Sequence, residues 1–527
     1  MTQDCQRLVK TWIQTAARGA AVFLCWAYAV CAEDVTITTT DGGLTLTGRV
    51  VSYDGALLQL DSAYGLMTLR YDEVICDGVS CPDPDTFVPL VRLSGAARMG
   101  EVMVPALIDA FARAEGYQAE TVREDAEHLT ITLSNGERPQ ARFALRLSNT
   151  DEGFADLIAF EADVVMAMRE VRAEEAERAS LVGLGDITSP RQARIIGFDA
   201  LVPLVNPAMD LRHVALRDVA RAYRGEITNW AELGGPEGPI SLHLGPRSGG
   251  PWQFFVDQIV RQGGQELSET VIRHDSARDV ALAVATTPGG LGMLPYGETA
   301  NGRAVALRDA CGFTAVPLNV TLKTQDYPLT EPLFLYAPDR RHSAVIRSFF
   351  AFLRGPEAQL VVRRAGFVDQ GAVPIPLDAQ GQRFANAIDQ AGAGIQLDDL
   401  QRMVRVLTPR TRLSTSFRFV EGSDQLDAAS RSNLMALGQA IRNGRYADQR
   451  LMLVGFGAAE DADGFAFDQS LRRAETVKAD LIAALGRLPG DVDVETAAFG
   501  AALPMGCNDT PWGRQRNNRV ELWVDQG

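Results

Sequence analysis

The feature that most constrains the fold is an alternation of apolar strands with amphipathic helices that starts near Thr86. The apolar run 88–93 leads into a helical pattern over 100–115, and further apolar runs follow at 162–168 and 195–205. Such alternation predicts parallel sheets with helices on both faces. Folds of this kind bind ligands at the carboxyl ends of the strands, where helix N-termini converge. The sequence therefore predicts an α/β fold with its site at that edge.

Composition narrows the class of protein. A chain of 527 residues predicts about three or four domains. Lys and Arg total 51 against 67 Asp and Glu, a formal net charge of −16, so we expect no nucleic-acid partner. Hydrophobic residues make up 46% and charged residues 22%, which argues against wholesale disorder and against a multi-span membrane protein.

The amino terminus is typical of a secretory signal peptide. Arg7, Lys10 and Arg18 form a basic region, an apolar stretch covers 20–29, and the small residues around Ala32 offer a cleavage site. The apolar stretch is too short to span a bilayer. Lipid attachment at Cys31 is the alternative, although 28–30 matches a lipobox poorly. We therefore predict export to the periplasm and removal of residues 1–32.

The next segment, 33–85, is predicted to be a small β module. Alternating residues at 35–38 and 44–47, followed by the run 57–60, indicate short strands between Gly-rich turns. An exported protein folds in an oxidising compartment, so Cys76 and Cys81 are predicted to form a disulfide. Zinc is the competing interpretation, but the chain lacks the paired ligand spacing of a structural site, and we predict no metal.

Domain boundaries follow from these changes of pattern. Residues 377–393 are rich in Ala, Gln, Asp and Gly, which predicts a linker with helical content over 371–410. A compact strand and helix unit follows it, with a helix predicted over 428–442 and a strand over 450–456. The expected order is a signal peptide (1–32), the small β module (33–85), a two-lobed α/β domain (86–370), the linker (371–410) and an α+β domain (411–527).

Three strand-to-helix junctions carry small or hydroxyl residues. Free backbone N–H groups at a helix start, with the helix dipole and a Ser hydroxyl, bind an oxyanion without a counter-charge. A plain helix cap or turn is the alternative for each junction taken alone. The junctions are Ser94–Gly100, Ser148–Gly153 and Gly245–Trp252.

Several motifs in the region from about Val88 to Val368 run in the order found in one known family. The region resembles the phosphate-type periplasmic substrate-binding proteins of ABC importers. The resemblance implies two α/β lobes joined by crossover strands that close on a tetrahedral oxyanion. The motifs are Asp199–Pro207, Arg224–Trp230, Gly290–Gly292, Asp326–Tyr336 and Gly366–Phe367.

The resemblance carries over ligand residues only in part. An Arg of the family falls on Leu244, and the acid that accepts the ligand's proton falls near Met168, so phosphate selectivity is weakened. Arg98, Arg169 and Arg247 could replace lost contacts, because guanidinium groups suit oxyanions. The alternative is that these arginines are solvated or paired structurally. The predicted oxyanion ligands are Ser94, Arg98, Met99, Ser148, Arg169, Arg247, Ser248, Gly249 and Gly250.

The last unit, about Leu413 to Val524, is similar to the OmpA-like peptidoglycan-binding domain. The motifs that carry this similarity are 417–427, 451–457, 470–477, 499–500 and 513–521. The family binds the diaminopimelate of the peptide stem with an Asp and an Arg. Arg473 takes the Arg position, but Ala458 takes the Asp position, so Asp461 or a neighbouring acid would have to reach the ammonium. The resemblance adds Asn517 and Arg519 as candidates, with a structural role as the alternative for Arg519.

Together these patterns predict a non-enzymatic periplasmic receptor for phosphate or a similar oxyanion, tethered to the cell wall or outer membrane and serving uptake or sensing. We expect no cofactor; an ABC permease is a candidate partner. One alternative is an envelope assembly protein whose lobes act as a scaffold. A phosphate-ester hydrolase is the weaker one, because the five histidines are scattered and only His243 lies near a predicted ligand loop.

Overall fold

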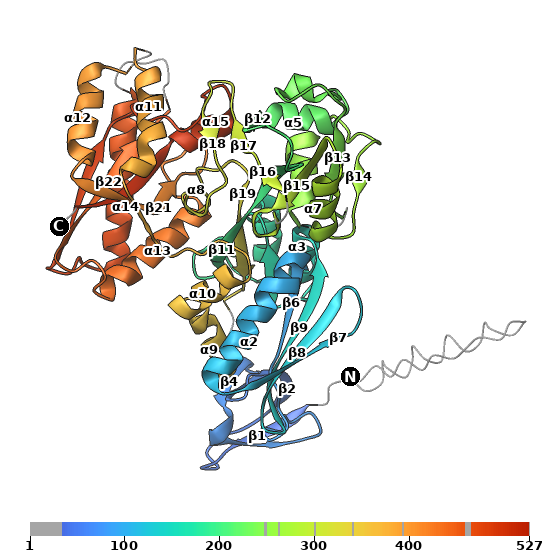
Figure 1. Cartoon of the computed structure of the whole chain (residues 1–527). Coiled ribbons are helices and arrows are strands. Elements are labelled where there is room, and N and C mark those ends of the chain that lie inside the picture. Colours follow the sequence, from blue (N-terminus) through green and yellow to red (C-terminus); the bar gives the residue numbers. More distant parts are fainter. Residues whose placement is uncertain are drawn as a thin grey trace, which may run out of the picture. The chain divides into compact units, whose positions relative to one another are not determined.

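The computed structural model describes residues 34–246, 250–261, 264–299, 302–339, 342–392, 395–458 and 465–525. The chain divides into two compact units, one that ends at Phe87 and one that begins at Val88 (Figure 1). The predicted signal peptide, residues 1–32, lies outside the described residues.

The first unit is an antiparallel sheet with strand order β4-β3-β2-β1-β5. Alternate residues face a small apolar core, which includes Ile37, Leu46 and Leu58. A disulfide joins Cys76 to Cys81, with 5.8 Å between the Cα atoms. The strands are β1 (Val35–Thr39), β2 (Thr45–Tyr53), β3 (Leu57–Ser62), β4 (Gly65–Arg70) and β5 (Val74–Asp77).

The second unit starts with a lobe whose sheet has β10, β6 and β9 in parallel, followed by antiparallel β8 and β7. The strands are β6 (Leu90–Ala96), β7 (Gln118–Arg123), β8 (His128–Asn135), β9 (Arg138–Ser148) and β10 (Val164–Ala167). The helices are α2 (Val104–Glu115), α3 (Thr150–Ile158), α4 (Ala173–Leu181), α9 (Ala344–Phe352) and α10 (Pro356–Arg364). Phe111 and Phe143 both contact the ring of Phe349, which packs α9 against α2 and the sheet.

Two antiparallel strands, β11 (Ala193–Val205) and β19 (Thr330–Tyr336), connect this lobe to the next. Beyond Ala200, β11 pairs with β15 of the second lobe. The further strands are β12 (His213–Ala215), β13 (Ser241–Leu244), β14 (Ile272–Arg273), β15 (Gly290–Pro295), β16 (Arg303–Ala304), β17 (Ala306–Arg308) and β18 (Thr314–Ala315). The helices are α5 (Leu216–Tyr223), α6 (Gly250–Phe254), α7 (Ala277–Thr286) and α8 (Asn319–Lys323). The predicted two-lobed α/β fold is confirmed.

The C-terminal domain has a sheet of order β20-β21-β24-β22-β23. Successive residues of β22 alternate between two apolar clusters on opposite faces of the sheet. One cluster includes residues of α13 and α14, and the other includes residues of α11 and α12. The segment 371–410 therefore contributes helices to the packing of this domain. The elements are β20 (Pro374–Ile375), α11 (Gly381–Asp389), α12 (Leu397–Leu407), β21 (Arg410–Arg418), α13 (Ala428–Arg442), β22 (Gln449–Phe456), α14 (Phe465–Leu485), β23 (Val492–Ala498), α15 (Pro511–Asn517) and β24 (Arg519–Asp525).

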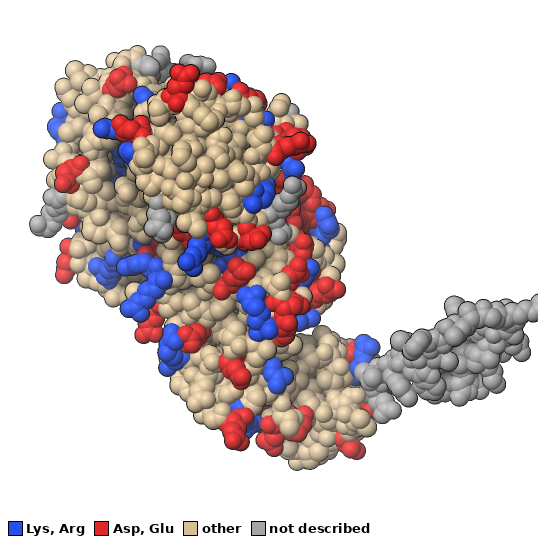
Figure 2. Space-filling model, turned by 45° about the vertical axis from the view of Figure 1, so that its right-hand side comes forward, with Lys and Arg blue, Asp and Glu red and all other residues tan. Residues whose placement is uncertain are grey.

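The surface of the described residues is mixed in charge. Figure 2 shows a face on which Lys and Arg side chains are interspersed with Asp and Glu side chains. Among the described helices, none combines the length and the apolar character needed to cross a membrane.

Candidate functional site

The first two predicted junctions lie side by side at the carboxyl ends of adjacent strands. Ala96 at the end of β6 is aligned with Ser148 at the end of β9, and Gly95 is aligned with Met166 of β10. Gly95 has φ of 131°, and a Cβ built there would lie 2.2 Å from the Met166 carbonyl oxygen. Only glycine permits this approach without strain. Three strand ends are thereby brought to one edge of the first lobe.

The start of α3 lies over this edge. Asn149 caps the helix by accepting a hydrogen bond from the Glu152 N–H at 2.9 Å. Thr150 Oγ1 accepts a 3.1 Å hydrogen bond from the N–H of Met168, which follows β10. Ser148 is half-buried. The structure thus brings the predicted ligand Ser148 and the loop after β10 to the N-terminus of one helix.

Ser94 and Met99 are buried beneath this edge. The Ser94 hydroxyl donates to Asp156 Oδ2 at 2.5 Å, and Arg146 Nη1 donates to the same oxygen at 2.6 Å. The Met99 side chain has no exposed surface and belongs to the core of the first lobe. Both predicted ligands are therefore internal in this structure, and the Ser94 hydroxyl is engaged by a carboxylate.

Arg98 is held by two carboxylates. Its Nε lies 2.5 Å from Asp199 Oδ2 on β11, its Nη1 pairs with Glu298 after β15, and its guanidinium lies over the Phe367 ring at 4.8 Å. Burial opposes the charge, but these two acids outweigh it and raise the pKa of Arg98. The positive charge predicted at Arg98 is therefore present, but two acids already neutralise it. Arg98 stands at a helix start of the first lobe, and one of these acids, Glu298, belongs to the second lobe.

Arg169 has the same arrangement. Its guanidinium pairs with Asp151 in the first turn of α3 at 2.5 Å and with Glu175 of α4 at 2.7 Å. The group also lies 5.3 Å from the centre of the Phe154 ring. Although burial favours the neutral form, the two acids raise the pKa of Arg169. Its contacts connect α3 to α4.

The third predicted junction is described only in part. Arg247, Ser248 and Gly249 lie outside the described residues, and Gly250 is the first residue of α6. Beneath this junction, Arg273 of β14 is aligned with Leu244 of β13 and donates through Nη1 to the Gly245 carbonyl at 2.9 Å. Sequence analysis missed Arg273, because its proximity to this loop depends on strand pairing.

His243 has an internal role. Its side chain is buried, its Nε2 lies 3.1 Å from Ser241 Oγ, and its Nδ1 lies 3.0 Å from His274 Nε2. Burial, together with the nearby His274, lowers the pKa of His243 to about 4. The imidazole is therefore neutral near pH 7 and connects β13 to the segment after β14.

In the C-terminal domain, Arg473 of α14 pairs with an acid that sequence analysis missed. Arg473 Nε lies 3.0 Å from Asp424 Oδ1, and its guanidinium lies 4.9 Å from the centre of the Phe419 ring. Ala458, at the expected Asp position, is buried, and Asp461 lies outside the described residues. The Asp424 side chain is 43% exposed, so the pair has one solvent-facing member.

Asn517 and Arg519, which were predicted to contact peptidoglycan, are core residues of this domain. Asn517 Oδ1 accepts from the N–H groups of Met505 and Gly506 at 2.6 and 3.1 Å. Arg519 is fully buried, donates to Glu521 at 2.7 Å and lies over the Phe456 ring. Both side chains are buried in this structure, and contact of either with peptidoglycan stays a prediction.

Comparison with known proteins agrees with this architecture. Residues 115–357 match the PBP superfamily domain, and residues 418–519 match the OmpA family. The chain thus joins a periplasmic-binding-protein-like domain to a C-terminal OmpA domain.

Curated relatives match the first of these domains. The phosphate-binding protein PstS of Bacillus subtilis is 27% identical over 250 residues, which cover 47% of this chain and 76% of the relative. The protein SphX of Synechococcus elongatus is 26% identical over 246 residues, covering 44% of this chain and 69% of the relative. The crystal structure of an ABC-type phosphate transport receptor from Vibrio cholerae is 16% identical, with a TM-score of 0.41 over 53% of this chain and 99% of that one.

Proposed function

We propose that this chain is an extracytoplasmic receptor that binds phosphate or a similar oxyanion at the edge formed by β6, β9 and the start of α3. The observation that carries the proposal is the convergence of the end of β9, which bears Ser148, and the end of β6 with a capped helix N-terminus. The named relatives that bind phosphate match the same domain. Binding is non-enzymatic in this proposal.

The charges at this edge determine how the anion is held. Arg98 and Arg169 each pair with two carboxylates, so neither offers an uncompensated positive charge. Backbone N–H groups and the Ser148 hydroxyl must then supply most of the contacts. Glu298, whose side chain is 37% exposed, provides an acceptor for a proton carried by the ligand. Phosphate carries such a proton near neutral pH and sulfate does not, which favours phosphate.

Isothermal calorimetry of the mature, ligand-stripped chain against phosphate, sulfate and phosphonate tests this proposal. We expect phosphate to bind selectively. Replacing Ser148 with Ala should weaken binding by about 1–3 kcal/mol, the scale of a hydrogen bond to a charged group. Ser180→Ala, at an exposed position of α4, serves as the control. Absence of heat with all three anions would contradict the proposal.

We propose further that the OmpA domain attaches the receptor to peptidoglycan. Asp424 offers an exposed carboxylate to the ammonium of a zwitterionic stem residue, in place of the acid lost at Ala458, and its buried partner Arg473 occupies the position of the family's Arg. Cosedimentation with purified peptidoglycan should be reduced by Asp424→Asn and unaffected by Asp493→Asn, which changes an exposed acid on β23. Equal sedimentation of the two variants would show that Asp424 is not part of the peptidoglycan-binding site.

A receptor fixed to the wall is poorly suited to shuttle between ligand and permease. Attachment at one position therefore favours sensing of the anion or its local delivery over free diffusion to an ABC permease. Pull-down of the mature chain from envelope extracts, with and without phosphate, distinguishes these roles: a permease retained with phosphate supports uptake.

A further inference from the structure

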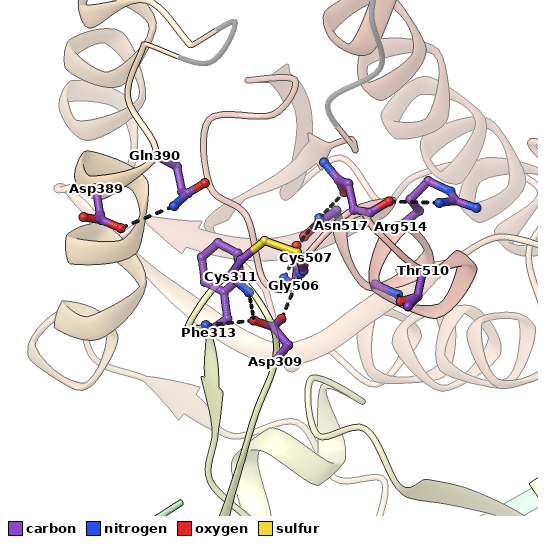
Figure 3. The surroundings of a disulfide bond; sticks show 12 residues. Asp309, Cys311, Phe313, Asp389, Gln390, Gly506, Cys507, Thr510, Arg514 and Asn517 are labelled. Atoms are coloured by element: carbon purple, nitrogen blue, oxygen red, sulfur yellow. Dashed lines mark hydrogen bonds between the residues drawn. A yellow bond between two sulfur atoms is a disulfide. The ribbon is translucent and has the colours of Figure 1, made fainter. Parts of the chain in front are cut away.

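The C-terminal domain is joined covalently to the second lobe. A disulfide connects Cys311, in the turn between β17 and β18, to Cys507 in the loop before α15 (Figure 3). The Cys507 N–H donates to Asp309 Oδ2 at 2.8 Å. Asn517, at the end of α15, orders the same loop through its hydrogen bonds to Gly506. The cysteine is therefore presented to the lobe by an ordered loop.

Asp326 makes a second attachment just before crossover strand β19. Its two carboxylate oxygens accept from Arg418 Nη2 at 2.9 Å and Arg412 Nη2 at 3.1 Å, and its carbonyl oxygen accepts from Arg516. All four side chains are nearly fully buried. Burial alone would raise the pKa of Asp326, but Arg412 and Arg418 hold it well below its ordinary value. This carboxylate is therefore charged in the interface, where it binds the sheet of the C-terminal domain to the hinge.

The first lobe contacts the C-terminal domain through apolar and polar groups, and Ala428 and Ala429 of α13 belong to the same apolar cluster as Phe154 and Val165. Glu170, which follows β10, accepts a 3.0 Å hydrogen bond from the N–H of Ala428 at the start of α13. Arg431 Nη2 donates to the Thr188 carbonyl at 3.4 Å. Burial, and repulsion from Asp427, raise the pKa of Glu170. No disulfide joins this lobe to the C-terminal domain in the described part of the chain.

We propose that the C-terminal domain acts as a brace across both lobes and restricts their opening and closing. Two-lobed binding proteins respond to ligand by hinge movement of one lobe relative to the other. Here the disulfide fixes the domain to the second lobe and Asp326 fixes it to the hinge, so the Glu170 contact must change whenever the first lobe moves. Ligand binding and the position of the wall-binding domain are consequently coupled, and by linkage each influences the other. This proposal rests on the two-lobed fold and does not depend on which ligand the lobes bind.

Distances between the lobes test the brace directly. Spin labels at Ala114→Cys on α2 and Arg278→Cys on α7, both exposed positions, report the interlobe distance in the full mature chain. The parent chain should give a narrow distribution. We expect Cys311→Ser with Cys507→Ser, combined with Glu170→Ala, to widen and shift that distribution. Phosphate affinity should change by about fivefold or more, the usual scale of coupling between sites.

Controls distinguish loss of the brace from general loss of structure, and they test the brace independently of phosphate binding. Cys76→Ser with Cys81→Ser removes a disulfide confined to the first unit and should leave the interlobe distance unchanged. If loss of Cys311–Cys507 prevents folding, Glu170→Ala alone, with both disulfides intact, should still widen the distribution. Unchanged distances in these variants would overturn the brace. Absence of phosphate binding would contradict only the proposed function, because the distances are measured without ligand as well.

Discussion

Arginines are concentrated in two regions of this chain, and the two regions differ in their balance of charge. At the edge of the first lobe, Arg98 and Arg169 each face two carboxylates. Between the lobes and the C-terminal domain, Asp326 and Glu521 are the two carboxylates that pair with a set of buried arginines. In the described part of the chain that set is Arg383, Arg412, Arg418 and Arg519, and the buried Arg516 donates beside them to the Asp326 carbonyl oxygen.

The difference shows what each region can do. Where acids match or exceed cations, the arginines position neighbouring elements and leave anion binding to N–H groups. Where cations exceed acids, each remaining carboxylate becomes indispensable, because a guanidinium group keeps its proton near neutral pH. Burial and the surrounding arginines lower the pKa of Arg383 to about 9 and that of Arg516 to about 10, which reflects this unfavourable excess.

The largest expected effect is at Asp326. Changing Asp326 to Asn leaves the buried Arg418 without its carboxylate partner and Arg412 with Glu521 alone, which should reduce the free energy of unfolding by about 3–5 kcal/mol. Chemical denaturation of the mature chain measures this loss. Asp109→Asn, which removes an exposed pair with Arg113, is the control and should cost at most about 1 kcal/mol. If Asp326→Asn and Asp109→Asn are equally stable, the excess of buried arginines does not destabilise the folded chain.

Loss of the Cys311–Cys507 disulfide should have the next largest effect. The two residues are 196 positions apart, so the bond closes a long loop in the unfolded chain. Replacing both by Ser should lower stability by about 2–4 kcal/mol, measured by thermal unfolding under oxidising conditions. Cys76→Ser with Cys81→Ser, which opens a much shorter loop, should cost less. A larger loss of stability in the Cys76 and Cys81 variant than in the Cys311 and Cys507 variant would contradict this prediction.

A third prediction concerns Glu331, aligned with Asp199 across β19 and β11. Both of its carboxyl oxygens are buried, and neither has a hydrogen-bond partner among the described residues. Burial, with repulsion from Asp199, raises its pKa well above the ordinary value. The folded state therefore binds more protons than the unfolded state at intermediate pH, and stability falls as pH rises through that window.

Glu331→Gln removes this penalty. The variant should gain stability over the parent chain with increasing pH, by up to about 1.4 kcal/mol per pH unit, and the advantage should disappear toward pH 4. Denaturation at pH 4, 6 and 8 provides the measurement. A constant difference at all three values would show that Glu331 ionises normally.

The smallest expected effect is on anion selectivity. Glu298→Gln removes the exposed acid beside Arg98, so sulfate should no longer be repelled and phosphate should lose a proton acceptor. We expect the preference for phosphate over sulfate to fall by about fivefold, equal to about 1 kcal/mol. Calorimetry with both anions measures the ratio. An unchanged ratio would place the anion away from Arg98.

Much of the architecture could be predicted because it depends on local patterns. The expected helix 428–442 is α13 over the same residues, and the expected strand 450–456 differs from β22 by one residue. The helix expected from about Gly100 begins instead with a π-helical turn, Met99–Met103, and α2 starts at Val104. Periodicity identifies such elements well and their ends less well, because the ends depend on packing.

The sequence by itself determined the kinds of domain and their order, since hydrophobic periodicity and glycine-bearing turns act over a few residues. It also indicated which serines and arginines stand at strand ends. Only the tertiary structure decided which charges meet. Arg98 with Glu298, Arg473 with Asp424, and Asp326 with Arg412 and Arg418 are pairs separated by 49 to 200 positions. A charge has no preferred partner at a fixed spacing in sequence, and its pairing depends on which strands and helices the fold brings together.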